Sequence, residues 1–190
     1  MNDVLQTIKQ RRAVRSYQSK LIEADKLELI VEAGLYAPNA GSRQSAIIAV
    51  SQNAEINAKI EALNAEAASK AFANRPAGHA VQSPTTDVKP SIFYGAPVVA
   101  TIFAPKDWYN FTLDCAVTAE NMLLAATSLG IGSNIIARAK ETFETDYGQS
   151  LKVQWGIPEE YEAKLHVVLG YANEDPGEAK PRKDGRVIYV

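Results

Sequence analysis

The sequence predicts an α+β fold, and three observations support this class. Short apolar runs typical of buried strands are interspersed with amphipathic segments typical of helices. The order lacks the regular strand–helix–strand repeat of a parallel α/β sheet. The chain has 190 residues, 46% of them hydrophobic and 22% charged, which is ordinary globular composition. We therefore expect a single domain over residues 1–190, without internal repeats.

The first part of the chain predicts two helices and a strand. Asn2 or Asp3 is expected to cap a first helix that runs into a group of arginines. A second helix is predicted over 27–35, where apolar residues recur at i, i+3, i+4 and i+8, and Pro38 ends it. A polar loop then leads into a short apolar run over 46–51, which we interpret as a buried strand.

The middle and the end of the chain continue the mixed pattern. The composition of residues 73–90 shifts to Pro, Gly, Ser and Thr, which predicts a loop or a lid. Around it we expect, in order, a helix over 56–67, a strand over 97–103, a helix over 112–129, a strand through 135–136, a helix over 141–155 and a buried strand over 165–169.

Two segments indicate a second subunit. The helix over 112–129 is apolar on most of its circumference, which predicts burial from more than one side. Residues 173–190 form a charged arm rich in Pro and Gly that ends in the β-prone sequence VIYV. Such an end is expected to pair with the edge of a sheet, on a partner chain.

Composition excludes several classes of partner. The formal net charge of −2 creates no field that would gather nucleic acid or anionic lipid. No apolar run approaches the roughly 20 residues that span a bilayer, and the N-terminus does not resemble a signal peptide. A single cysteine rules out an internal disulfide framework and a multi-thiolate metal site, and with only two histidines no zinc site is expected. We expect a cytoplasmic protein with no metal, no nucleic-acid partner and no membrane segment.

A group of arginines stands at the predicted end of the first helix. Arg11, Arg12 and Arg15 offer planar sets of N–H donors that suit a phosphate group. A solvated basic turn has the same spacing, so this alternative stays open. A nucleic-acid surface is a weaker alternative, because the chain is slightly acidic overall.

Two further groups carry polar side chains. The loop over 38–45 places Asn39, Ser42 and Gln44 beside exposed backbone. These groups either line a polar ligand or simply connect a helix to a strand. The basic segment over 180–183 is a solvated tail unless it folds back to meet the arginines near residue 11.

The sequence contains no recognisable set of residues for acid–base or nucleophilic catalysis. It lacks GxGxxG, the phosphate loop of nucleotide hydrolases, and GxSxG. Cys115 lies within the apolar helix and His166 begins an apolar strand, so both are expected to be core residues. We therefore predict no catalytic side chain and a bound cofactor that carries the reaction.

Taken in order, these segments resemble the FMN-dependent nitroreductase family. The resemblance is carried by RRAVRSY at 11–17, KLELIVEAGLYAPNAGSRQ at 26–44, YGAPVV at 94–99, DCAVTAENMLLAATSLGIGS at 114–133, VVLGYANEDP at 167–176 and KPRK at 180–183. Each piece alone is weak, whereas the ordered set over nearly the whole chain is specific. The resemblance implies a mixed central sheet flanked by helices, in an intertwined homodimer with one FMN in each of two clefts at the subunit interface.

The resemblance also implies which residues hold the flavin. Those facing its phosphate and ribityl chain would be Arg11, Arg12 and Arg15, helped by Arg182 and Lys183, while Ala13 would touch the cofactor. Those approaching from the other subunit would be Pro38, Asn39, Ala40, Ser42 and Gln44. Ile136 and Ala137 would lie against the isoalloxazine. The helix over 112–129 would form the dimer core, and the C-terminal arm would embrace the partner.

The implied reaction is a ping-pong transfer of reducing equivalents. NAD(P)H would reduce the flavin at N5, and a nitroaromatic, a quinone or a similar small acceptor would then take its place. Two alternatives stay open: a flavin-binding carrier or sensor without useful turnover, and a relative that uses FMN for other chemistry such as dehalogenation.

The chain departs from the family pattern at four positions. Ala13 stands where members often carry Ser, Ser42 replaces a common Asn, and Ser45 replaces a proline. Arg138 follows Ala137, where many relatives keep small residues. Arg138 could guard the site, bind an anionic substrate or point away. The acceptor and the choice between NADH and NADPH therefore stay open.

Overall fold

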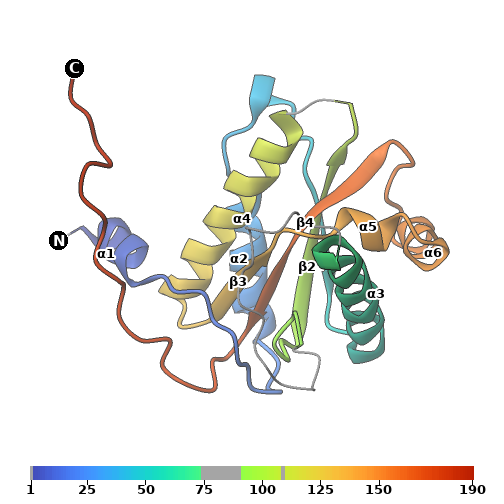
Figure 1. Ribbon diagram of the computed structural model, residues 1–190, viewed down its shortest axis with the longest axis horizontal. Helices are drawn as coiled ribbons and strands as arrows, with labels where there is room; N and C mark the ends of the chain where they lie inside the picture. Colours follow the sequence, from blue (N-terminus) through green and yellow to red (C-terminus); the bar gives the residue numbers. More distant parts are fainter. Residues whose placement is uncertain (1, 74–90, 108–109) are drawn as a thin grey trace.

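The computed structural model describes residues 2–73, 91–107 and 110–190. It has three layers, with a central sheet between two sets of helices (Figure 1). This architecture confirms the predicted α+β class. Of the segment predicted as a loop or lid over 73–90, only Ala73 lies within the described residues, where it ends a helix.

The sheet contains four strands in the order β1-β2-β4-β3. These are β1 (Ile47–Ser51), β2 (Val98–Pro105), β3 (Gly132–Ile136) and β4 (Tyr161–Gly170). Neighbouring strands are antiparallel, and Ala13 adds an isolated parallel bridge to Ser133 of β3. The strand predicted over 46–51 is present as β1, but the prediction that it is buried is wrong. Because β1 lies at the sheet edge, its middle residues are half-buried and Val50 is exposed.

Two helices cover one face of the sheet. They are α2 (Ala24–Leu35) and α4 (Asn110–Ser128), and they share an apolar core with inward residues of β2 and β4. Gly34 permits their close approach, since a Cβ there would lie 2.8 Å from Met122 Cγ. Cys115 is fully buried in this core, as predicted.

Three helices cover the opposite face. They are α3 (Ala54–Ala73), α5 (Lys140–Phe143) and α6 (Asp146–Gln154). The predicted single helix over 141–155 is therefore wrong. Thr145 interrupts it by accepting a hydrogen bond from Gly148 N and capping α6. A Cβ at Gly148 would lie 2.3 Å from Thr142 O, so only glycine fits where α6 begins against α5.

The N-terminal helix α1 (Asp3–Gln10) is capped by Asn2, whose side chain accepts from Val4 N at 2.9 Å. None of its residues is buried in the single chain. The C-terminal arm, residues 173–190, is also exposed and lies outside the layered body (Figure 1). Neither segment therefore contributes a buried residue to the two apolar cores of the single chain.

His166 on β4 is fully buried, as expected for a core residue. Its Nδ1 lies 2.9 Å from Thr101 Oγ1 on β2, and its ring meets the edge of Phe93. Burial lowers the pKa of His166 to about 3, so the ring is neutral at pH 7. It is a structural histidine rather than a proton carrier.

Candidate functional site

The arginine segment begins where α1 ends. Arg11 caps the helix and its backbone leaves the helical conformation there. Its Nε lies 3.8 Å from Glu120 Oε1 on α4, a loose ion pair whose arginine side chain is 29% exposed. Arg15 is exposed and forms no ion pair or hydrogen bond with any other part of the chain that the structure describes. Both guanidinium groups are therefore available to an anion.

Arg12 differs from its two neighbours. Its Nη1 donates to Lys9 O and Arg11 O, both at 2.7 Å, so the guanidinium folds back over the carboxyl end of α1. There it satisfies carbonyl groups that the helix leaves without intrahelical partners. Its Nε is buried and has no partner among the described residues. This orphaned donor is the feature of Arg12 that fits a bound anion.

The chain after Arg12 is fixed at both ends. Ala13 bridges Ser133 on β3, and Val14 N donates to Ser133 O at 3.0 Å. Tyr17 is buried, bridges Ala172 and donates to Val14 O at 3.1 Å. Burial raises the pKa of Tyr17, so its hydroxyl stays protonated and serves as an anchor. Arg15 is thereby presented from a short extended segment with little freedom.

Two hydrogen bonds hold the loop over 38–44, and in each a backbone N–H of the loop donates to a side-chain oxygen. Asn39 Oδ1 accepts from Gln44 N at 2.8 Å, and Asp114 Oδ1 on α4 accepts from Ala40 N at 3.1 Å. Ser42 and Gln44 have positive φ values of 52° and 48°, a region that non-glycine residues rarely occupy. Strain of this kind is often retained at functional sites. The side chains of Pro38, Ser42 and Gln44 are exposed, and Asn39 and Ala40 are half-buried.

Asp114 is a site residue that the sequence analysis missed. It is 6% exposed, and its Oδ2 has no partner within the described part of the chain. A carboxylate between the apolar residues Leu113 and Cys115 of the helix was the available signal, because a buried charge needs a specific partner. Its contact with Ala40 ties the loop to α4.

The residues predicted to lie against the flavin ring are at the carboxyl end of β3. Ile136 is half-buried and pairs with His166, and Ala137 is exposed. Arg138 forms an ion pair with Glu141 at 2.6 Å. Its carbonyl accepts a hydrogen bond from Asn64 of α3. The ion pair with Glu141 holds the Arg138 side chain toward α5.

The basic tail does not meet the arginine segment within one chain. Arg182 donates to Lys180 O at 3.2 Å and 2.7 Å and makes no other hydrogen bond among the described residues. Lys183 is exposed. The predicted contribution of Arg182 and Lys183 therefore depends on an arrangement of the arm that a single chain does not supply.

The remaining predicted site residues contact α4 or lie on or next to β3. The loop contacts α4 at Asp114, and Arg11 faces it at Glu120, about 9 Å further along the helix axis. Ala13 lies beside β3 at Ser133, which is three residues before Ile136 on that strand. Across the described ranges, no helix is long and apolar enough to cross a bilayer, and no cluster of His, Cys, Asp and Glu could hold a metal.

The chain is similar to known proteins along most of its length. A model described as the nitroreductase family matches residues 8–171. An NADPH-flavin oxidoreductase of Vibrio harveyi is 25% identical over 192 residues, which cover 99% of this chain and 73% of the relative. A Methanothermobacter thermautotrophicus protein, provisionally named NADH dehydrogenase/NAD(P)H nitroreductase, is 27% identical over 92% of this chain and 80% of its own.

Two solved structures match the fold of this chain over its full length. A Bacteroides fragilis nitroreductase with bound FMN is 32% identical, with a TM-score of 0.79 over 100% of both chains. A Desulfitobacterium hafniense nitroreductase with bound FMN has the same fold, with 23% identity and a TM-score of 0.82 over 100% of this chain and 99% of that one. On the extent of the family match, the chain belongs to the nitroreductase family.

Proposed function

We propose that this chain is an FMN-dependent oxidoreductase that passes reducing equivalents from NAD(P)H to a small organic acceptor in a ping-pong cycle. The observation that carries the proposal is the arginine segment fixed against β3, with the guanidinium groups of Arg11 and Arg15 open to an anion. It lies in a chain matched along its full length by a nitroreductase with bound FMN.

The donors of this segment fit the phosphate end of a flavin mononucleotide. Guanidinium groups form paired, charge-assisted hydrogen bonds with phosphate oxygens. The orphaned Nε of Arg12 adds a buried donor beside Arg11 and Arg15. Any contribution of Arg182 and Lys183 requires the basic tail to approach this end. These donors would hold the phosphate, and Ala13, which lies beside β3, would contact the rest of the cofactor.

The ring end is formed by residues with small or uncharged side chains. Ile136 and Ala137 present a half-buried and an exposed surface at the end of β3, against which a flat ring can lie. The strained loop over 38–44 offers exposed carboxamide and hydroxyl groups that can bond the polar edge of the ring. When bound, FMN supplies hydride acceptance and return at N5. The chain contributes position, donors and exclusion of water.

A homodimer explains the apolar surface that the single chain leaves exposed. On α4, Leu113 is 59% exposed and Val117 is 38% exposed, and their i, i+4 spacing puts them on one face. On α1, Val4 and Leu5 are more than half exposed. Exposed apolar side chains grouped on one helix face are typical of an interface. A second chain packed on α4 would bring its own loop over 38–44 toward the arginine segment of the first.

The arm is proposed to complete this dimer. Its last residues, 187–190, are apolar and exposed, and basic residues precede them. On the edge strand β1 and on α2 lies an apolar groove of about 480 Å³, lined by Leu27, Val31 and Val50 and rimmed by Glu28 and Glu32. The acidic rim complements the basic residues over 180–186 that precede the apolar end of the arm. The 18 residues from Asn173 to Val190 can span about 60 Å when extended, which is enough to reach a partner.

Two linked measurements test the proposal. Titration of flavin-free protein with FMN, followed by fluorescence, should saturate at one FMN per chain. Initial rates with NADH or NADPH against a nitroaromatic and a quinone should then give parallel double-reciprocal lines, because the two substrates use the site in turn. Stoichiometric FMN with no turnover would instead favour a flavin carrier, and failure to bind FMN would reject the proposal.

A further inference from the structure

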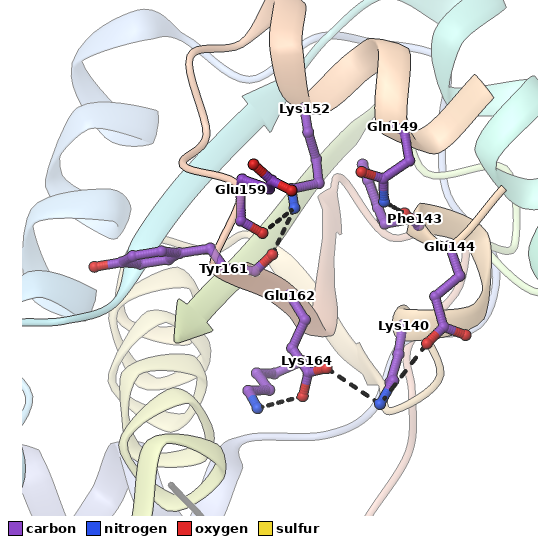
Figure 2. Close-up of polar contacts among 9 residues, drawn as sticks. All are labelled: Lys140, Phe143, Glu144, Gln149, Lys152, Glu159, Tyr161, Glu162 and Lys164. Atoms are coloured by element: carbon purple, nitrogen blue, oxygen red, sulfur yellow. Dashed lines mark hydrogen bonds and ion pairs between the residues drawn. The ribbon is translucent and has the colours of Figure 1, made fainter. Parts of the chain in front are cut away.

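A second polar pocket lies away from the arginine segment, on the sheet face covered by α5 and α6. We call it the lysine pocket, defined by Lys106, Lys140, Lys152, Glu144 and Glu162. Its volume is about 210 Å³, and it opens between the end of β2, the start of β4 and the two helices (Figure 2). Neither the family match nor the proposed reaction assigns it a role.

Lys152 is the central group of this pocket. It lies on α6, is 3% exposed, and its Nζ donates to Glu159 O at 3.2 Å and to Tyr161 O at 2.6 Å (Figure 2). An ammonium group has three N–H donors. The third finds no acceptor among the residues that the structure describes. A buried cation with an unused donor is costly unless a ligand satisfies it.

The carboxylates of the pocket are already paired with Lys140 and Lys164. Glu162 is shared by Lys164 at 2.6 Å and Lys140 at 3.1 Å, and Glu144 lies 3.8 Å from Lys140. Lys106 and Lys152 have no carboxylate within ion-pair distance in the described ranges. Burial is the larger cause of the lowered pKa of Lys152. The positive charge of Lys106 lowers this pKa further, because the two ammonium groups lie near each other. The carboxylates of Glu159, Glu160 and Glu162 offset part of this lowering.

These observations favour an anion over the other ligand classes. The described part of the chain contains no group of acidic or imidazole ligands suited to a metal ion. An apolar ligand would leave the unused N–H of Lys152 unsatisfied. We propose that the lysine pocket binds a small phosphate-type oxyanion, whose oxygens accept from Lys152 and Lys106. The ion would join α6 to the end of β2, and its binding does not depend on the proposed flavin reaction.

Calorimetric titration of FMN-saturated protein with inorganic phosphate, at constant ionic strength, tests the proposal. We expect one phosphate per chain, and at least tenfold weaker binding in Lys106→Ala, equivalent to about 1.4 kcal/mol. Lys106 is exposed, so this variant should fold normally. Lys152→Met should lose phosphate binding altogether. Lys70→Ala is the matched control, because Lys70 is a 74% exposed lysine on α3, and it should bind phosphate like the wild type.

Two further arms separate the sources of phosphate and the two anion sites. Glycerol phosphate that binds as tightly as inorganic phosphate identifies an esterified ligand, whereas binding of inorganic phosphate alone identifies the free ion. The double variant Arg11→Ala with Arg15→Ala should keep phosphate binding while its flavin content falls. The proposal is overturned if no saturable binding is measured, or if Lys106→Ala binds phosphate with unchanged affinity.

Discussion

Removing the two open guanidinium groups should empty the flavin site without unfolding the protein. In the double variant Arg11→Ala with Arg15→Ala, each substitution deletes charge-assisted hydrogen bonds to phosphate, which contribute about 1.5–3 kcal/mol each. Two such losses correspond to roughly 10²–10⁴-fold weaker FMN binding. Because neither arginine is fully buried, we expect a value near 10²-fold.

The same variant should remain folded. The only ion pair it loses among the described residues is the loose contact of Arg11 with Glu120, at 3.8 Å. A pair of this exposure is worth about 0–1 kcal/mol. Fluorescence titration with FMN and urea unfolding would measure the two effects separately. Lys9→Ala is the control, because it removes a neighbouring exposed cation outside the proposed clamp. Wild-type FMN affinity in the double variant would refute the phosphate assignment.

Three further predictions concern the frame of the site. Gly132→Ala would place a Cβ 2.9 Å from Val14 Cγ2, so urea unfolding should show about 1–3 kcal/mol of lost stability; an unchanged midpoint would contradict this packing. Burial holds the pKa of His166 at about 3, below its ordinary 6.5. Between these two values the unfolded chain binds a proton that the folded chain does not. The free energy of unfolding should therefore fall as the pH drops below 6.5, by up to about 1.4 kcal/mol per pH unit. His166→Asn should flatten that slope, and an identical slope in the variant would assign it to other groups. Truncation after Ala172 should weaken the dimer in sedimentation experiments, whereas a truncated protein that stays dimeric at low concentration would reject the arm exchange.

Much of the fold could be predicted because burial leaves a strong mark on the sequence. The run over 97–103 is apolar except for Thr101, because β2 is a central strand with helices on both faces. The division between α5 and α6 could not be predicted in this way. It depends on the close approach of Gly148 to the carbonyl of Thr142, which spacing alone does not indicate.

The candidate site was predictable to a similar degree. The arginine segment and the loop over 38–44 could be found from residue type, since both gather polar groups between apolar elements. Residue type could not distinguish Arg12 from Arg11 and Arg15, because its role at the end of α1 depends on local backbone geometry. The partner of Asp114 is a backbone amide 74 residues away, a contact that only the packing of the loop on α4 establishes.

Anaerobic mixing of the FMN-loaded protein with NADH, and separately with NADPH, tests the central claim most directly. The absorbance of the flavin near its visible maximum is followed before and after addition of a nitroaromatic or a quinone. The account predicts bleaching by at least one nicotinamide faster than steady-state turnover, and recovery of the colour when the acceptor is added. Flavin that stays oxidised with both nicotinamides, in protein that binds FMN stoichiometrically, would contradict the assignment as an NAD(P)H oxidoreductase.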